Sequence, residues 1–573
     1  MMDYTLMVGG EAGQGIQTIG GTLAKVFSRE GYHVLTHQDY ESRVRGGHNF
    51  YRVRISEEPV ASPRQGVDIL IALDRESMAR HSGELNAGAA VIYDADALQV
   101  RYEGEAFLDI PLERIAVERG GSRVMSNVAA IGAALGALGL AQRPLPEVLE
   151  WALHGKGRDV VEGNVRVAEE GYRHGSKACA KCGFEPGRPG EAKMLIAGND
   201  AVGLGALASG CRFYAAYPMT PSTGIMNYLA ARSGDYGIVV EQAEDEIAAI
   251  NMVLGASYAG VRSMTGTSGG GFSLMVEGLS LAAMTETPVV IVLAQRPGPA
   301  TGFPTRTEQG ELLFASHAAH GEFPRVVFAP GDPRQAFLLT CKAFDLAERY
   351  QVPCIIMTDQ YLADSEWTYG EFEFDCVSYA DHRLRGDPLS EAAGYKRYAF
   401  TSGGVSPLAV PGASRHLVVA DSDEHDEEGH IVEDALTRTR MVEKRLLLKS
   451  PALKEAIAPP LRYGSENPEV VIAGWGSTYG CMREAVDRLS PDTDIAMLHF
   501  SEICPFPDTG RYGFMEALEN ARFTICVENN ASGQFRRLVR AETGYEFGAG
   551  LNRCDGRPFT VDDVLGGLHD LIR

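Results

Sequence analysis

The acidic run 241–246 contains the carboxylates that are best placed for chemistry. It leads into an apolar segment that predicts a helix over residues 243–259. At about 100° per residue, Glu246 lies roughly 40° from Ile250, on the apolar face of this helix. A carboxylate on an apolar face needs a buried partner. Glu246 is therefore the first candidate for an acid that acts on a ligand.

The neighbouring acids Glu244 and Asp245 have a simpler explanation. Negative side chains near a helix N-terminus are stabilised by the helix dipole, and these two fall off the apolar face. The same dipole accounts for the charge of Glu246 but not for its position. We expect Glu244 and Asp245 to be helix-end charges only.

A rigid loop precedes the acidic run. Pro218 and Pro221 are three residues apart, a spacing that neither a helix interior nor a central strand tolerates. They join an apolar strand, 212–217, to a helix that begins near Ser222. Thr220 therefore lies at a strand end, the edge where ligands of open α/β sheets collect.

Another polar group follows a later strand. Arg296 comes directly after the apolar strand 289–294 and opens a Pro/Gly-rich loop that extends to Thr305. An arginine at a strand end beside a rigid loop can bind a carboxylate bidentately. The alternative is an ordinary surface arginine.

These motifs belong to one stretch of alternating strands and helices. That alternation predicts a parallel sheet with right-handed crossovers. The strands are predicted at 194–197, 213–216, 238–240, 263–265, 289–294, 325–328 and 354–358.

The motifs resemble the α subunit of 2-oxoacid:ferredoxin oxidoreductases, most closely the 2-oxoglutarate enzyme. The residues that carry the resemblance are Tyr217-Pro-Met219-Thr220-Pro-Ser222, Glu246 with Ile-Ala-Ala, Gly266-Thr-Ser268-Gly269-Gly-Gly271 and Arg296 to Thr305. The family pattern usually has Ile at Met219 and Ser at Ala300, so both departures are mild.

The resemblance implies thiamine diphosphate chemistry. In the family a carboxylate lies against N1′ of the aminopyrimidine and promotes loss of the C2 proton, while the cofactor serves as the electron sink. Glu246 matches that carboxylate. The other residues implied at the cofactor are Tyr217, Thr220, Ser268 and Gly269.

The resemblance also assigns the substrate contacts. Thr220 and Arg296 would hold the 1-carboxylate and the 2-oxo group, and with Glu246 they form the catalytic set. Thr305 would contact the distal carboxylate of 2-oxoglutarate. Coenzyme A is the implied acyl acceptor, and oxidised ferredoxin the electron acceptor.

Two motifs that this chemistry requires are missing. The chain has no Gly-Asp-Gly sequence to hold Mg²⁺ and the diphosphate, and no four clustered cysteines for an iron–sulfur cluster. We therefore predict an obligate β subunit that carries the Mg²⁺–diphosphate site and a [4Fe-4S] cluster. Two such pairs would form a dimer of heterodimers, and no metal is expected on this chain.

Residues 1–175 predict a first α/β domain with a possible anion site. A strand at 4–8 leads through Gly9-Gly-Glu-Ala-Gly13-Gln-Gly15 to a helix at 16–29. Such a turn can cradle a phosphate, or it can only permit a tight bend. It resembles the start of the family's γ domain, which implies coenzyme A contacts for Gly13, Gly15, Arg43 and Arg45. A solvated hairpin end is the alternative for the two arginines.

The rest of the chain predicts a linker (176–192), a pyrimidine-binding domain (193–365), a connector (366–462) and a transketolase-like C-terminal domain (463–573). Cys179-Ala-Lys-Cys182 lies in the linker; it has no second CxxC partner, so we expect incidental or structural thiols rather than zinc, cluster or redox ligands. The connector holds Asp421 to His430, expected to be a solvated acidic loop, and then a helix over 431–453. The fold class is thus α/β, with three α/β domains.

Composition limits the partners. A net charge of −23 argues against nucleic acid or an anionic membrane. The longest apolar run, 128–141, is too short to span a bilayer, and no basic region precedes Asp3. The scattered cysteines are typical of a reduced, cytoplasmic protein.

Three alternatives stay open. The acid could be pyruvate or a branched-chain 2-oxoacid. The chain could instead be a non-catalytic nucleotide-binding partner, with Glu246 only a helix-end charge. An NAD-dependent dehydrogenase is disfavoured, because no convincing ribose-binding acid follows the second strand.

Overall fold

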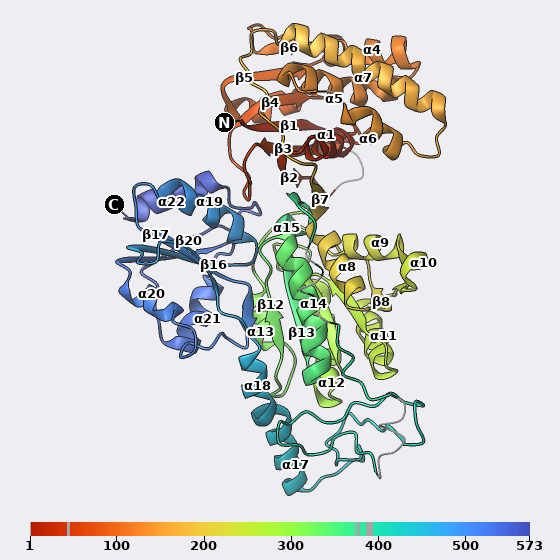
Figure 1. Cartoon of the computed structure of the whole chain (residues 1–573), viewed down its shortest axis with the longest axis vertical. Coiled ribbons are helices and arrows are strands. Elements are labelled where there is room, and N and C mark those ends of the chain that lie inside the picture. Colours follow the sequence, from red (N-terminus) through yellow and green to blue (C-terminus); the bar gives the residue numbers. More distant parts are fainter. Residues whose placement is uncertain are drawn as a thin grey trace. The chain divides into compact units, whose positions relative to one another are not determined.

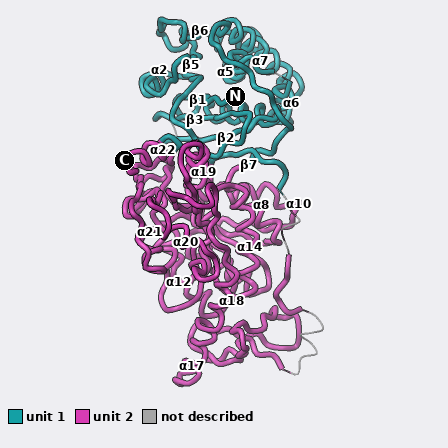
Figure 2. The backbone as a smooth tube through the Cα atoms, turned by 60° about the vertical axis from the view of Figure 1, so that its left-hand side comes forward, with its two compact units in different colours: residues 1–196, 365–372, 560–562 teal, residues 197–364, 373–559, 563–573 magenta. Residues whose placement is uncertain are grey.

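The computed structural model describes residues 2–42, 46–141, 143–372, 374, 377, 379–385 and 394–572. The chain forms two compact units (Figure 2). Unit 1 comprises Met1–Ile196, Ser365–Phe372 and Thr560–Asp562, and unit 2 comprises Ala197–Asp364, Glu373–Phe559 and Asp563–Arg573. No helix in the described ranges is long and apolar enough to cross a membrane.

Unit 1 is built on an eight-stranded mixed sheet (Figure 1). In spatial order its strands are β6 (Phe107–Asp109), β5 (Leu85–Tyr93), β4 (Val67–Ala72), β1 (Asp3–Ala12), β3 (Gly46–Ser56), β2 (His33–Asp39), β14 (Glu366–Tyr369) and β7 (Met194–Ala197). The β2–β3 hairpin is antiparallel, whereas β1, β4, β5 and β6 run parallel.

The helices of unit 1 pack through small residues. They are α1 (Ile16–Glu30), α2 (Arg75–His81), α3 (Ala95–Leu98), α4 (Leu112–Gly120), α5 (Ser126–Leu138), α6 (Pro144–Ala152) and α7 (Arg158–Ala178). A Cβ added at Gly132 would lie 2.1 Å from the Ala168 carbonyl, and one at Gly175 would lie 2.1 Å from the Ala133 carbonyl. Glycine at these positions lets the α5 and α7 backbones touch.

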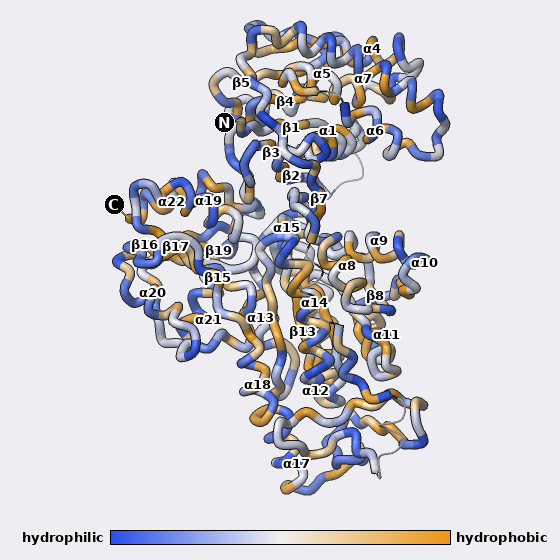
Figure 3. Tube along the Cα trace, viewed as in Figure 1, coloured by the Kyte–Doolittle hydropathy of each residue, from blue (hydrophilic) through white to orange (hydrophobic). Residues whose placement is uncertain are grey.

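Unit 2 contains the predicted core sheet. Its seven strands, in spatial order, are β18 (Glu502–Cys504), β12 (Val326–Phe328), β13 (Pro353–Asp359), β11 (Val289–Gln295), β10 (Ser263–Thr267), β8 (Phe213–Ala216) and β9 (Val239–Gln242). All neighbours are parallel except β12 and β18. Every residue of β11 and β13 is buried, as expected for a sheet that is covered on both faces. Figure 3 shows apolar stretches of the chain around β13.

Helices α8 and α14 pack together on this sheet, as do α11 and α12. The helices of the core are α8 (Gly198–Ala208), α9 (Thr223–Ala230), α10 (Ser233–Tyr236), α11 (Glu246–Tyr258), α12 (Gly269–Met284), α13 (Leu312–His317), α14 (Pro333–Tyr350) and α15 (Gln360–Asp364). The predicted face of α11 is correct, since Ile250, Val253 and Leu254 join the apolar core with Phe272 of α12.

A second sheet in unit 2 completes the α/β architecture. Its strands, in spatial order, are β15 (Leu461–Gly464), β17 (Ile495–Phe500), β16 (Val470–Trp475), β19 (Phe523–Glu528) and β20 (Ala549–Asn552), with helices α19 (Tyr479–Leu489), α20 (Phe514–Asn520), α21 (Gln534–Thr543) and α22 (Val561–Ile572). With three sheets flanked by helices, the predicted α/β class is confirmed.

One predicted strand belongs to a different sheet. The sequence places Met194–Ala197 in the core sheet, which is wrong: β7 pairs with β14 at the edge of the unit 1 sheet. The partner β14 follows the core domain in sequence and joins β2 through the Trp367–Leu35 pair. A short apolar strand fits the edge of either sheet, so only the long-range pairing decides its place.

The linker cysteines, expected to be structural or incidental thiols, are instead bonded to each other. Cys179 and Cys182 form a disulfide just after α7. A turn in which the Cys182 N–H donates to the Cys179 carbonyl (3.1 Å) brings their Cα atoms to 5.0 Å, a usual separation for a disulfide.

The connector differs from its prediction in two ways. The helix predicted over 431–453 is divided into α17 (Ala435–Val442), a π-helical segment (Glu443–Leu448) and α18 (Lys449–Glu455). The acidic loop is not simply solvated. His425 is fully buried against the Tyr398 ring at 4.0 Å, and Glu424 accepts two hydrogen bonds from Arg445. A cation from the following helix thus draws the loop inward.

Candidate functional site

Site residues gather at the carboxyl ends of four neighbouring strands in unit 2. The chain passes from β8 to the edge strand β9 and then crosses to β10 on the other side of β8. The connections that follow β8 and β10 leave in opposite directions, and ligands of doubly wound sheets bind at such a switch point. Thr220, Glu246, Ser268 and Arg296 follow β8, β9, β10 and β11.

Glu246 is the first residue of α11 and is only 4% exposed. The Asp245 carboxylate caps the helix by accepting from the Ala248 N–H (2.7 Å), and Glu244 is exposed. Both acids therefore behave as the helix-end charges predicted. Glu246 does not: its Oε1 is buried and has no hydrogen-bond partner in the described structure.

The start of α12 lies directly against this carboxyl group. A Cβ added at Gly271 would lie 2.5 Å from Glu246 Oε1 and 2.1 Å from Thr267 Oγ1. Both distances are too short for a Cβ unless the Glu246 and Thr267 side chains move, so glycine at 271 lets the helix start lie against the carboxyl group. The Thr267 hydroxyl also reaches the Met219 sulfur at 3.9 Å. The Gly-rich run and the Pro218–Pro221 loop thus meet beside Glu246.

A second acid, the half-buried Glu311, also lies against the Gly-rich run. Its Oε1 is 1.9 Å from where a Cβ at Gly269 would stand, so a side chain at 269 would displace this carboxyl group. Burial and the nearby Glu308 together raise the pKa of Glu311 to about 8, although Arg296 opposes the shift. The Glu311 carboxyl group is therefore largely protonated near neutral pH, and its Oε2 has no partner among the described residues.

Arg296 connects this acid to the Pro-rich loop. Its Nη1 donates to the Thr220 carbonyl at 2.8 Å, and burial lowers the pKa of Arg296 while Glu311 opposes that shift. The structure thus brings together Thr220 and Arg296, which the sequence paired from positions 76 residues apart. The remaining N–H groups of the guanidinium give the site a cation that can bind a carboxylate.

Several other polar atoms at this edge are buried without partners in the described structure. They are Ser268 Oγ, Thr265 Oγ1 and Tyr214 Oη. A Cβ at Gly266 would lie 2.7 Å from Tyr214 Oη, which places the tyrosine beside the same strand end. Unsatisfied buried polar groups are rare in native proteins, and their concentration here is typical of a site that a ligand completes.

Two other residues that the sequence predicted for the site differ in their exposure to solvent. Tyr217 is 41% exposed, whereas Thr305 is buried at 8%. The sequence prediction missed Glu308 and Glu311. A signal was available, because both acids follow the Pro/Gly-rich loop in the polar run Thr307-Glu-Gln-Gly-Glu311, but nothing in that run marks burial.

Unit 1 has a pocket of about 350 Å³ next to its Gly-rich turn. It is lined in part by Gly13, Gln14, Arg123, Ser126 and Asn127. Gly13 and Gly15 both have positive φ, and a Cβ at Gly15 would lie 1.9 Å from the Asn127 amide. The turn therefore needs glycine for its backbone and also borders a polar pocket. Arg43 and Arg45 lie outside the described residues.

No group of three or more His, Cys, Asp or Glu side chains in the described ranges is arranged to hold a metal ion. Glu246 and Glu311 instead lie against the glycines at 271 and 269, and Arg296 acts electrostatically on Glu311. This arrangement suits an organic ligand better than a cation.

Two family models match the chain. Residues 204–444 match the model described as "Pyruvate flavodoxin/ferredoxin oxidoreductase, thiamine diP-bdg". Residues 5–174 match the one described as "Pyruvate ferredoxin/flavodoxin oxidoreductase". The first match contains the strand-end site, and the second contains the unit 1 pocket.

Curated relatives and a solved structure extend the likeness to the whole chain. The 2-oxoacid:ferredoxin oxidoreductase subunit alpha of Sulfolobus sp is 32% identical over 100% of this chain and 97% of its own length. The 2-oxoglutarate synthase subunit KorA of Methanothermobacter marburgensis is 31% identical over 66% of this chain and 98% of its own. The solved 2-oxoglutarate:ferredoxin oxidoreductase from Magnetococcus marinus is 31% identical with a TM-score of 0.92, covering 100% of both chains.

Proposed function

This chain belongs to the α subunits of the 2-oxoacid:ferredoxin oxidoreductase family, and on that premise we propose that its substrate is 2-oxoglutarate. The reaction would convert 2-oxoglutarate, coenzyme A and oxidised ferredoxin reversibly into succinyl-CoA, CO₂ and reduced ferredoxin. The support for this acid is that a curated relative is named 2-oxoglutarate synthase. The matching structure from Magnetococcus marinus is described with 2-oxoglutarate, coenzyme A and succinyl-CoA bound.

The observation that carries the catalytic proposal is the unpartnered Oε1 of Glu246. Thiamine diphosphate supplies a carbon nucleophile and an electron sink when it is bound. A carboxylate that is buried at 4% exposure without a partner can share a proton with a ring nitrogen in a short, charge-assisted bond. Glu246 would hold that proton, and Thr267, Ser268, Gly269 and Tyr217 would surround the pyrimidine.

Arg296 and Thr220 would orient the substrate. The guanidinium already donates to the Thr220 carbonyl, which fixes its direction and leaves other N–H groups for the 1-carboxylate. The Thr220 hydroxyl would contact the 2-oxo group, and Thr305 would contact the distal carboxylate. Glu311, which is largely protonated near pH 7, would avoid repelling an anionic substrate.

The remaining functions are assigned to partners. A β subunit would hold Mg²⁺, the diphosphate and a [4Fe-4S] cluster, and would pass electrons to ferredoxin in a dimer of heterodimers. The absence of a Gly-Asp-Gly sequence from this chain supports that division. Coenzyme A would bind at the unit 1 pocket near Gly13 and Arg123, whose amide, hydroxyl and guanidinium donors suit a phosphorylated ligand.

A comparison of turnover among 2-oxoacids tests which acid is the substrate. The chain, co-purified with its partner subunit, should have a kcat/KM for 2-oxoglutarate at least about tenfold above that for pyruvate or 2-oxoisovalerate, because a site built for a second carboxylate rejects acids that lack it. Thr305→Val should raise KM for 2-oxoglutarate and leave KM for pyruvate unchanged. Equal or higher activity with pyruvate would replace 2-oxoglutarate by one of the other 2-oxoacids.

A further inference from the structure

A second polar pocket lies at the opposite edge of the core sheet from the candidate site. It has a volume of about 450 Å³ and is lined in part by residues that directly precede β8 and β10. Arg212 stands before β8 and Arg262 before β10. These positions are at the amino ends of the same two strands whose carboxyl ends carry Thr220 and Ser268, so the two sites are separated by the length of the sheet.

Arginines dominate the charge of this pocket. Among the described residues, its lining contains Arg212, Arg262, Arg383 and Arg385 against one acid, Asp381. The chain as a whole has a net charge of −23. A concave region of the opposite sign in such a protein focuses the local field on small anions.

A buried acid below the pocket holds two of the arginines in place. Glu348, 2% exposed, lies in the last turn of α14, where the helix dipole disfavours a negative charge. Arg262 Nε donates to it at 2.8 Å, and Arg383 forms an ion pair with its other oxygen. Arg262 also donates to the Ser209 and Ala380 carbonyls. These contacts fix both guanidinium groups before any ligand arrives.

The other two arginines are exposed and lightly engaged. Arg385 donates to the Gly260 carbonyl (2.8 Å) and to Asp381 (3.1 Å), and Arg212 donates to the Cys211 carbonyl (3.0 Å). One carboxylate, Glu348, is shared by two guanidinium groups, and Asp345 nearby is paired with His382 (2.8 Å). Positive charge therefore exceeds negative charge around the cavity.

The pKa of Arg383 agrees with this surplus of positive charge. Burial, together with the positive charges of Arg262 and Arg385, lowers the pKa of Arg383 to about 9. A ligand anion would relieve that repulsion. The exposed Tyr379 ring covers the Arg262 guanidinium at 4.5 Å and adds an aromatic wall to the polar lining.

We propose that this pocket binds a phosphate-bearing small molecule, held by the exposed Arg212 and Arg385 above the fixed Arg262–Glu348–Arg383 group. Guanidinium groups bind phosphate oxygens bidentately. The volume is in the range of sites for small ligands, and the position makes it a site separate from the one around Glu246.

The test uses the full-length chain together with its partner subunit and thiamine diphosphate. Binding of inorganic phosphate, pyrophosphate and ADP is measured by isothermal titration calorimetry, with citrate as an anion that lacks phosphorus. The double variant Arg212→Gln/Arg385→Gln leaves the Arg262–Glu348–Arg383 group intact. Arg522→Gln, which removes an exposed arginine that pairs with Glu469 at 2.8 Å, is the matched control.

We expect at least one phosphate compound to bind wild type and the Arg522→Gln control equally, and to bind the double variant at least tenfold more weakly. Binding should weaken as salt rises, because exposed charges are screened. The proposal is overturned if no phosphate compound binds at millimolar concentration, if the double variant binds like wild type, or if citrate binds as tightly as the phosphate compounds.

Discussion

Two buried glutamates in unit 2 show how differently the same side chain can be used. Glu246 is 4% exposed and its Oε1 has no partner in the described structure, whereas Glu286 is 1% exposed and each of its oxygens is bound by a lysine. Burying a carboxylate without compensation is unfavourable. An acid that only supports the fold is therefore expected to be paired, as Glu286 is, and the unpaired one indicates a missing ligand.

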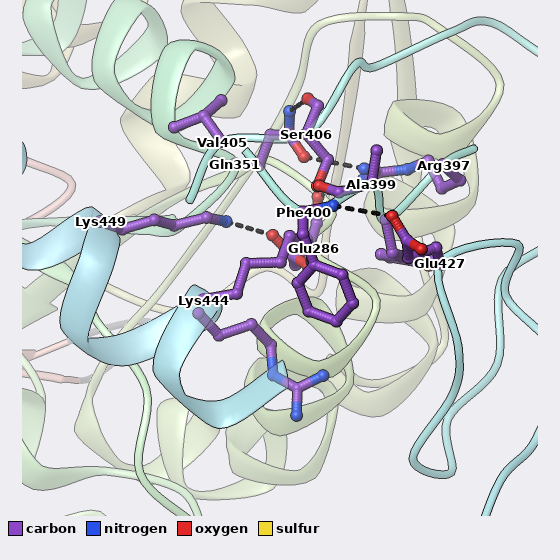
Figure 4. Close-up of polar contacts among 12 residues, drawn as sticks. Glu286, Gln351, Arg397, Ala399, Phe400, Val405, Ser406, Glu427, Lys444 and Lys449 are labelled. Carbon is purple, nitrogen blue, oxygen red and sulfur yellow. Dashed lines mark hydrogen bonds and ion pairs between the residues drawn. The ribbon is translucent and has the colours of Figure 1, made fainter. Parts of the chain in front are cut away.

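The Glu286 cluster ties the connector to the core domain (Figure 4). Lys444 Nζ lies 2.5 Å from Glu286 Oε1, and Lys449 binds the other oxygen; both lysines are fully buried. Arg397 donates to the Glu286 carbonyl at 2.7 Å and to Gln351 Oε1 at 2.8 Å. Lys449 and Lys444 lower the pKa of Glu286 against the effect of burial. The cluster is thus a structural ion pair with no free acceptor.

The largest expected effect is a loss of stability when the paired acid, Glu286, is replaced. Glu286→Gln leaves two buried lysines without a counter-ion, and breaking such a pair costs about 3–5 kcal/mol. The urea midpoint should fall, and protease cleavage within 434–455 should rise. Lys396→Gln is the control, because its exposed pair with Glu427 is worth about 1 kcal/mol or less. Equal losses in both variants would contradict the structural role of Glu286.

The next largest effect is a loss of activity when the unpaired acid, Glu246, is replaced. Glu246→Gln should lower ferredoxin reduction at least about a hundredfold, because the amide cannot exchange a proton with the cofactor ring. Its urea midpoint should stay at the wild-type value, since no intramolecular partner of Oε1 is lost. Loss of C2 hydrogen–deuterium exchange on bound thiamine diphosphate reports the same step directly. Unchanged turnover would favour the non-catalytic interpretation.

A smaller effect is expected on the pH dependence of stability, through the carboxyl group of Glu311. Its pKa is raised to about 8 from an ordinary 4.5, so between these values the folded state holds a proton that the unfolded chain has lost. Stability therefore falls as pH rises through that window. Glu311→Gln should flatten this slope and remove a kcat/KM limb near pH 8. An identical urea-midpoint profile from pH 5 to 8 in both proteins would refute the shift.

The smallest effect is expected at Lys444. Two lysines neutralise one glutamate, and burial lowers the pKa of Lys444 to about 8 although Glu286 opposes this. Lys444→Met leaves the Glu286–Lys449 pair intact and fills similar volume, so the free energy of unfolding should change by about 1 kcal/mol or less. A loss as large as that of Glu286→Gln would mean that both lysines are needed.

Local patterns in the sequence determined much of this protein. The strands 213–216, 289–294 and 354–358 were predictable from apolar runs, and each agrees with the structure within one residue. The helical period placed Glu246 on the apolar face, where it is buried. Apolar runs placed Thr220 and Arg296 at strand ends, and the family resemblance paired them; in the structure Arg296 donates to the Thr220 carbonyl. These features depend on neighbours within a few residues, so they can be read from the chain alone.

Only the tertiary structure decided which groups are paired and which are not. Glu286 follows a helix in an unremarkable sequence, and its lysines come from 158 and 163 residues away. Glu311 has a raised pKa because distant elements bury it, and β7 joins the unit 1 sheet because its partner β14 lies in a later segment. Burial and pairing depend on which distant elements pack together. No local pattern contains that information, and it separates the carboxylate proposed to be catalytic, Glu246, from the structural one, Glu286.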